Sequence, residues 1–233
     1  MKGIVNFLSL FIVGLAIGLP ISATAENLPA YVVADFKYLP MHGYGEWASY
    51  LPNSYPVAVL GLGIIIDSNL GVELGYEGTT TRAQSLTINP PTTFFNSALT
   101  GTTTIQSNLT FQNWYLDFFA YAPIIKGVKL FATAGLNYAK PSLRVRQTVN
   151  NGTANLITAS QLQAKALWRG GFGAEYTSDN NWGLRTMVRW ENYDRLRFSQ
   201  QTVDNIQGTV PGYYYGPIFN NTYSTSLGVF YSF

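Results

Sequence analysis

The chain ends on Thr222-Tyr223-Ser224-Thr225-Ser226-Leu227-Gly228-Val229-Phe230-Tyr231-Ser232-Phe233. Alternate positions carry mostly large apolar side chains, namely Tyr223, Thr225, Leu227, Val229, Tyr231 and Phe233. The positions between them carry mainly small or polar residues, namely Thr222, Ser224, Ser226, Gly228, Phe230 and Ser232. Because successive side chains of a β-strand point to opposite faces, this pattern predicts a strand with one apolar face.

The same alternation recurs along the chain, and no segment after the N-terminal region has a convincing helical period. It predicts eight strands, at residues 31–38, 55–66, 70–78, 109–122, 128–139, 164–177, 182–195 and 222–233. Residues 55–66 are apolar on both faces, so the pattern does not fix the register of that strand. Most of the segments are close to the roughly 9–11 residues with which a tilted strand crosses a bilayer.

The connections between these segments alternate between short and long. Turn-forming residues fill the short ones, at 67–69, 123–127 and 178–181. The long ones are 39–54, 79–108, 140–163 and 196–221. Outer-membrane barrels have short periplasmic turns and longer extracellular loops. The sequence therefore predicts an all-β fold, an eight-stranded antiparallel transmembrane up-and-down β-barrel, with both termini in the periplasm.

The composition excludes several other classes of protein. Only 11% of the 233 residues are charged, against about 25% in a typical soluble domain, while 15% are aromatic. The absence of cysteine and the single histidine exclude a disulfide scaffold, a thiolate site and a multi-histidine zinc site. The formal net charge of +2, without a basic cluster, argues against nucleic acid as a partner. We expect no metal or cofactor.

The N-terminal 25 residues have the pattern of a secretory signal peptide. Lys2 supplies the positive start, residues 7–19 form a nearly unbroken apolar stretch, and Ala23-Thr24-Ala25 is a small-residue cleavage site. The alternative is an uncleaved membrane anchor, which Pro20 and the cleavage site disfavour. We therefore expect a cleaved signal peptide at residues 1–25 and a barrel domain at residues 26–233.

The side chains on the two faces indicate which face meets lipid. The apolar faces carry Trp114, Trp168, Trp182 and Trp190, as in the aromatic girdles of membrane barrels. The opposite faces carry six basic residues, Lys37, Lys129, Lys165, Arg169, Arg185 and Arg189. They also carry six acidic residues, Asp35, Glu73, Glu77, Asp117, Glu175 and Glu191. This number of ionisable groups disfavours a soluble lipocalin-like barrel and predicts a paired charge network that fills a narrow lumen.

Short motifs add a family resemblance. Residues 228–233, with Val229, Tyr231 and Phe233 at alternate positions, resemble the C-terminal signal that the barrel assembly machinery recognises. With residues 70–76 and 171–176, the mature chain resembles small eight-stranded outer-membrane barrels of the OmpA/OmpX-like superfamily. The resemblance implies a Gram-negative outer membrane location, contact with outer-membrane lipid and lipopolysaccharide, and assembly by that machinery. We expect a monomer.

The long loops point to a structural or surface-interaction role. They combine small polar residues with aromatic candidates for contact with a host or surface ligand, namely Tyr44, Trp47, Tyr50, Phe94, Phe95, Tyr213, Tyr214 and Tyr215. Long surface loops without a ligand, antigenic only, are the simpler interpretation. We therefore expect a non-enzymatic protein, adhesin-like or antigenic.

Two alternatives stay open at this point. In a narrow, low-conductance porin-like channel, the basic residues of the lumen would set an anion preference. A lipid A-modifying enzyme would need a histidine with a nucleophile or a carboxylate, and the chain offers only His42 near Glu46 and Ser49. These residues match no enzyme motif, so no catalytic residue is assigned.

Overall fold

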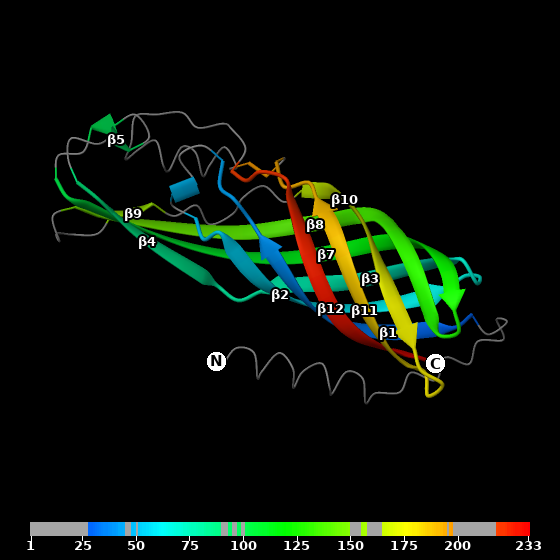
Figure 1. Cartoon of the computed structure of the whole chain (residues 1–233). Helices are drawn as coiled ribbons and strands as arrows, with labels where there is room; N and C mark the ends of the chain where they lie inside the picture. The colour runs from blue at the N-terminus through cyan, green and yellow to red at the C-terminus, as the bar shows by residue number, and fades with distance from the viewer. Residues whose placement is uncertain are drawn as a thin grey trace.

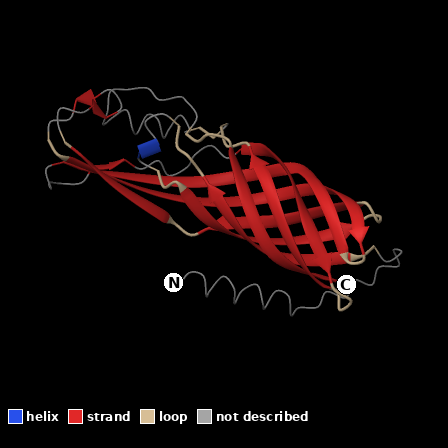
Figure 2. Ribbon diagram, viewed as in Figure 1, coloured by secondary structure: helices blue, strands red, loops and turns tan. Residues whose placement is uncertain are grey.

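The computed structural model describes residues 28–44, 48–49, 51–89, 93–94, 97–98, 101–149, 155–157, 165–194, 196–197 and 218–233. Eight of its strands form the barrel wall: β1 (Ala30–Pro40), β2 (Ser54–Ile65), β3 (Leu70–Thr79), β7 (Thr103–Ile125), β8 (Val128–Val149), β10 (Lys165–Thr177), β11 (Trp182–Glu191) and β12 (Thr222–Ser232). Figures 1 and 2 show them as a tilted cylinder. No helix in these residue ranges is long and apolar enough to cross a membrane.

The barrel is closed and antiparallel throughout. The strand order is β7-β3-β2-β1-β12-β11-β10-β8, and β7 pairs with β8 to complete the ring. The first and last strands meet in register from Tyr31↔Ser232 to Tyr38↔Thr225. Because the ring is closed, no strand of the wall has an unpaired edge. An unpaired edge would expose backbone polar groups to lipid, where nothing can hydrogen-bond to them. The predicted fold class is therefore confirmed.

The outward faces of the wall strands are apolar. Phe172 is 67% exposed, Leu227 64% and Trp168 58%. Other large apolar side chains exposed on the wall are Phe36, Leu62, Leu74, Trp114, Phe118, Tyr138, Trp182, Leu184 and Tyr223. Exposed apolar area on this scale would aggregate in water, but it is what a lipid-facing surface requires.

The two ends of the barrel differ, and we call the end with the short connections the turn end. It holds the links between β2 and β3, between β7 and β8, and between β10 and β11. In the last of these, Asn181 adopts a positive φ of 66°. The described ends of the chain also lie here, because the Phe233 amide donates to the Ala30 carbonyl at 2.8 Å.

At the opposite end, which we call the extended end, the structure corrects the sequence prediction. β7 and β8 run far beyond the predicted 109–122 and 128–139, and they stay paired from Thr103↔Val149 onward. Two further strands flank them, β4 (Arg82–Ile88) on β7 and β9 (Asn155–Ile157) on β8. The prediction that all of 79–108 and 140–163 is loop was therefore wrong. We call β4, β9 and the paired segments 103–111 and 141–149 the extended sheet (Figure 1).

Smaller differences concern strand ends. β7 continues to Ile125 through a register shift after Pro123, so only residues 126–127 form that turn. The sequence predicted the strand end before Pro123, because proline has no amide hydrogen to donate to a neighbouring strand. In the structure the register shift between Pro123 and Ile125 accommodates the proline within β7. The strand predicted at 182–195 ends at Glu191. A pair of two-residue antiparallel strands, β5 (Thr93–Phe94) and β6 (Ser97–Ala98), lies within the predicted loop 79–108.

The barrel interior has three layers. Nearest the extended end is an apolar cluster in which Phe111 packs edge to face with Tyr55 at 5.5 Å. Its other members are Leu39, Met41, Leu51, Val57, Val59, Ile105, Leu109, Tyr115, Ala139, Leu143, Leu167, Tyr193, Leu196, Ile218 and Phe219. Near the turn end lie two small apolar clusters: Phe119, Tyr121, Phe131 and Met187 in one, Tyr31, Val33 and Phe230 in the other. Ionised side chains fill the layer between.

Candidate functional site: a buried charge network and an extended sheet

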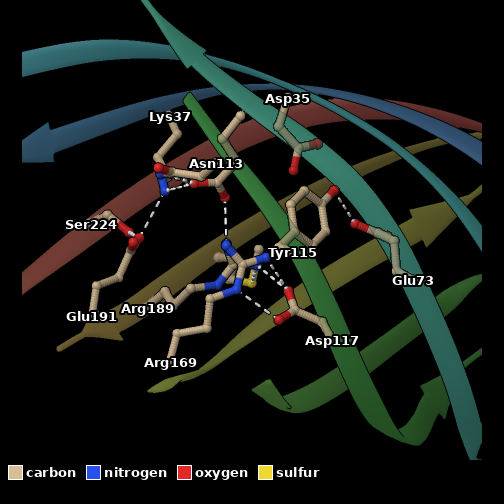
Figure 3. A network of polar contacts seen from close by, with 12 residues as sticks. Asp35, Lys37, Glu73, Asn113, Tyr115, Asp117, Arg169, Arg189, Glu191 and Ser224 are labelled. Atoms are coloured by element: carbon tan, nitrogen blue, oxygen red, sulfur yellow. Dashed lines mark hydrogen bonds and ion pairs between the residues drawn. The ribbon is translucent and has the colours of Figure 1, made fainter. Parts of the chain in front are cut away.

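Strand alternation positions the charged middle layer. Inward side chains lie two residues apart, so β1 supplies Asp35 and Lys37, while β11 supplies Arg185, Arg189 and Glu191. The neighbouring strands add Glu73 and Glu77 from β3, Asp117 from β7 and Arg169 from β10. All nine are at most 6% exposed. Figure 3 shows most of them converging on the barrel axis.

Arg185 organises the part of the network nearer the turn end. Its Nη2 lies 2.6 Å from Oδ2 of Asp35, and its Nη1 lies 2.6 Å from Oε2 of Glu73. Two tyrosines complete the shell of Glu73: Tyr31 donates to Oε2 at 2.9 Å and Tyr115 to Oε1 at 2.7 Å. One guanidinium therefore joins two carboxylates from different strands.

Arg169 organises the part nearer the extended end. It forms a bidentate pair with Asp117, with Nε–Oδ1 at 2.7 Å and Nη2–Oδ2 at 2.6 Å, and its Nη1 donates to Glu77 at 2.6 Å. Its guanidinium also lies over the Tyr115 ring, 4.1 Å from the centroid. Arg189 reaches Oδ2 of Asp117 at 3.0 Å. Bidentate geometry of this kind is the strongest form of carboxylate recognition that arginine offers.

Lys37 and Glu191 close the network against the apolar cluster. Lys37 Nζ lies 2.6 Å from Glu77 and 2.9 Å from Glu191. Glu191 also accepts hydrogen bonds from the hydroxyls of Tyr193 at 2.9 Å and Ser224 at 2.6 Å. Each of these carboxylates therefore has several donors, which offset the cost of removing it from water.

Glycine on neighbouring strands makes room for the carboxylates. A Cβ at Gly135 would overlap the Asp117 carboxylate and the carbonyl oxygen of Leu116. A Cβ at Gly228 would overlap the carboxylate of Asp35. The glycines of the predicted strands therefore accommodate large polar neighbours in the lumen.

The structure places the twelve predicted lumen residues unequally. Ten are buried, and nine of these form the network described above. The tenth, Glu175, lies 3.7 Å from the half-buried Lys129 near the turn end. Lys165 is half-buried at the start of β10, and no ion pair joins it to a carboxylate in the described ranges. Lys129 and Glu175 both line the cavity at the turn end.

Sequence reasoning did not select the neutral members of the network. These are Tyr31, Asn113, Tyr115, Tyr193 and Ser224. The signal was present, because Asn113 and Tyr115 share the inward face of β7 with Asp117. An inward tyrosine alone, however, does not indicate whether its hydroxyl meets a carboxylate or a neighbouring ring.

The loop candidates are only partly described. Tyr44 is 47% exposed, and its amide donates to the Ile218 carbonyl at 2.8 Å. Phe94 is in β5, with only its backbone described. Outside the described residues lie Trp47, Tyr50, Phe95, Tyr213, Tyr214 and Tyr215. His42 is exposed, and Glu46 lies outside the described ranges.

Of the three residues of the C-terminal motif, Val229 and Tyr231 are on the outward face of β12, and Phe233 directly follows the strand. Val229 is 44% exposed and Phe233 is 69% exposed. Tyr231 lies between them, half-buried, with its ring 5.0 Å from that of Trp182 and 5.3 Å from that of Phe233. The motif therefore forms an aromatic patch at the turn end.

A cavity of about 190 Å³ opens at the turn end. Tyr31, Tyr121, Lys129, Glu175 and Arg185 are among the residues that line it. It reaches the charged layer at Arg185, which its pairs with Asp35 and Glu73 hold in place. Within the described ranges, no group of three or more His, Asp or Glu side chains is arranged to hold a metal ion.

Solved structures place this architecture among known proteins. Neisserial surface protein A is 14% identical in sequence with a TM-score of 0.50, and the match covers 88% of this chain and 97% of that one. The fold is that of the small outer-membrane β-barrels. The barrel also matches Ail of Yersinia pestis, solved with a heparin analogue, over 89% of this chain and all of that one (11% identity, TM-score 0.47). The N-terminal β-barrel domain of Pseudomonas aeruginosa OprF is 12% identical in sequence, with a TM-score of 0.41. The match covers 89% of this chain and 98% of that one.

The sequence comparisons add nothing to this result. No protein family model and no curated protein sequence matches the chain. The predicted resemblance to small eight-stranded outer-membrane barrels is confirmed at the level of the fold.

Proposed function

We propose that the chain is a non-enzymatic outer-membrane barrel with a closed interior, which acts outside the membrane as a structural contact surface. The observation that carries the proposal is the order of the interior layers. A conduction pathway needs a polar or water-filled lining along its whole length. Here the charged layer lies beneath an apolar cluster in which Leu39, Leu109 and Phe219 have no exposed surface.

The charged layer itself also opposes conduction. An ion crossing it would have to displace side chains such as Arg169 and Glu77, which already satisfy one another at 2.6 Å. Separating buried, paired charges is strongly unfavourable. The network therefore serves to hold six wall strands together, and the narrow-pore alternative would require it to rearrange.

The extended sheet supports a role outside the membrane. β7 has 23 residues, which at about 3.3 Å per residue gives about 75 Å, far more than a tilted strand needs to cross a bilayer. The surplus lies at the extended end, where the contact candidate Tyr44 is 47% exposed. This end is the one we propose faces the surroundings of the cell.

The experiment that tests closure is a current recording. The chain, refolded into a planar lipid bilayer, is expected to give no stable conductance. Arg189→Gln serves as the comparison, because Arg189 makes the longest ion pairs to Glu77 and Asp117 in the network, at 3.4 and 3.0 Å. A reproducible wild-type conductance that this variant alters would refute the closed interior and establish the pore.

Export and orientation complete the proposal. Residues 1–25 would be removed on export, the short turns would face the periplasm, and Val229, Tyr231 and Phe233 would be the signal for barrel assembly, giving a monomer. Intact mass of the chain recovered from outer membranes tests the cleavage. A protease added to whole cells should cut in the loops of the extended end and spare residues 178–181. Cleavage at those residues in intact cells would reverse the orientation.

A further inference from the structure

The cavity at the turn end is lined by a row of inward side chains that the strand register places next to one another. Glu175 of β10 pairs with Lys129 of β8 on one side and with Arg185 of β11 on the other. Directly paired residues of an antiparallel sheet have Cβ atoms about 4.5–5.5 Å apart. All three side chains line the cavity. A carboxylate flanked by two cations therefore forms part of its wall.

The charge network is unbalanced at this end. Arg185 joins two carboxylates, those of Asp35 and Glu73. The part nearer the extended end pairs three cations with three carboxylates, namely Lys37, Arg169, Arg189, Glu77, Asp117 and Glu191. With every group ionised, that part is neutral. One cation against two carboxylates leaves a net charge of −1 around Arg185, which is where the cavity reaches the network.

Lys129 and Glu175 together add no charge, but they leave a carboxylate open to a ligand. Their Nζ and Oε1 atoms are 3.7 Å apart, which is too far for a direct hydrogen bond. The Lys129 ammonium lies 5.3 Å from the centroid of the Tyr121 ring. Glu175 is only 8% exposed, so bulk water solvates it little. Its carboxylate can therefore accept a hydrogen bond from a donor inside the cavity.

Aromatic and aliphatic side chains form the rest of the wall. Tyr31 and Phe230 pack edge to face with their ring centroids 6.1 Å apart, and Pro29, Ile65 and Tyr121 also line the cavity. Aromatic rings attract a cation that lies within about 6 Å of the centroid. A cavity of about 150 Å³ can hold benzene. The 190 Å³ of this cavity therefore accommodate a molecule with a single aromatic ring and one polar group.

We infer that this cavity binds a small organic cation, a primary ammonium group on an apolar body of about one ring. The ammonium donates to Glu175 and faces the rings of Tyr31 and Tyr121, and its charge offsets the surplus carboxylate at Asp35 and Glu73. A neutral molecule of the same shape would leave that surplus, and an anion would add to it. The charged layer closes the cavity towards the extended end, so the site is blind. Only the compartment that supplies the ligand, the periplasm, rests on the proposed orientation.

A fluorine NMR titration of the full chain in zwitterionic detergent micelles tests the inference. The probe is para-fluorobenzylamine, and protein-free micelles give the blank for partition into detergent. Wild type should bind it about tenfold more tightly than para-fluorobenzyl alcohol, its neutral counterpart. Glu175→Gln should bind the amine about tenfold more weakly, because the carboxylate that accepts the ammonium is lost. Lys129→Gln should bind it about fivefold more tightly, because a competing charge is removed.

Two matched controls make the same charge changes at the turn end but outside the cavity. Asp179→Asn and Lys126→Gln alter an exposed pair, at 87% and 89% exposure, and should bind as wild type does. Opposite shifts for Glu175→Gln and Lys129→Gln would support the site, since a general loss of structure would weaken binding in both.

Three results would overturn the inference. The first is equal affinity for the amine and the alcohol. The second is wild-type or weaker affinity in Lys129→Gln, which decides alone if Glu175→Gln does not fold. The third is displacement of the amine by sodium ions at the same concentration, which would show a site for any small cation instead. None of these results affects the closed interior, which the conductance test addresses.

Discussion

Replacing Arg169 by methionine removes one of the two arginines that each join two buried carboxylates, while keeping an unbranched side chain. The change deletes two hydrogen bonds to Asp117 and one to Glu77, at 2.6–2.7 Å, together with the contact on the Tyr115 ring. Both carboxylates stay buried with less than their full complement of donors. Removing one partner of a buried ion pair lowers the free energy of unfolding by about 3–5 kcal/mol. Because Arg189 still reaches both carboxylates, we expect the lower half of that range.

The assay is equilibrium unfolding by urea in lipid vesicles, followed by tryptophan fluorescence. A double-mutant cycle with Asp117→Asn isolates the pair, and residues in one network commonly couple by about 0.5–3 kcal/mol. The exposed pair Lys126–Asp179 supplies the control, because both partners are almost fully solvated, at 89% and 87%. Its removal should leave the unfolding midpoint unchanged. An Arg169→Met variant as stable as wild type would refute the argument that the network holds the wall.

Three further changes test separate features. Gly135→Ala should destabilise the barrel by about 1–3 kcal/mol, because the added Cβ overlaps the Leu116 backbone and the Asp117 carboxylate. Gly170→Ala is the control, because the nearest atom to its added Cβ is 3.4 Å away, and equal unfolding midpoints of the two variants in urea would contradict this reasoning. Phe172→Arg places a charge in lipid at the middle of β10 and should lower the free energy of unfolding by about 2–4 kcal/mol, while Phe172→Leu should lower it little. An arginine variant as stable as wild type would mean that this face does not meet lipid. Tyr193→Phe removes the buried 2.9 Å hydrogen bond from the Tyr193 hydroxyl to Glu191 and should lower the free energy of unfolding by about 1.5–3 kcal/mol in the same assay. An unchanged free energy of unfolding would show that the hydroxyl is dispensable.

The wall could be predicted from the sequence because lipid and a narrow lumen impose opposite demands on alternate residues. β10 and β11 show this most clearly, with Trp168 and Phe172 outside and Arg169 and Arg189 inside. The extended sheet was missed for the same reason. Beyond the membrane the outward positions of β7 become Thr104, Gln106, Asn108 and Thr110, so the apolar alternation on which the prediction depended disappears.

The pairing inside the lumen was beyond prediction. Alternation places Arg185 inside the barrel, but its contact with Asp35, 150 residues earlier, depends on the stagger of β11, β12 and β1. A shift of one strand by two residues would keep every side chain on the same face and give each charge a different partner. The sequence determines which groups share the interior, and only the closed ring determines which of them meet.

The pairing of β1 with β12 has a consequence for how the molecule folds. Tyr31 and Ser232 are joined across almost the whole chain, and the contacts Asp35–Arg185 and Lys37–Glu191 span the same seam. Contacts this distant in sequence make folding slow, because a long loop must be closed before they form. Until then Asp35 lacks Arg185 and Glu191 lacks Lys37, so an open sheet in the membrane leaves these two carboxylates without their ion-pair partners. Closure of the ring and neutralisation of the interior are therefore a single cooperative event, and it awaits the last strand.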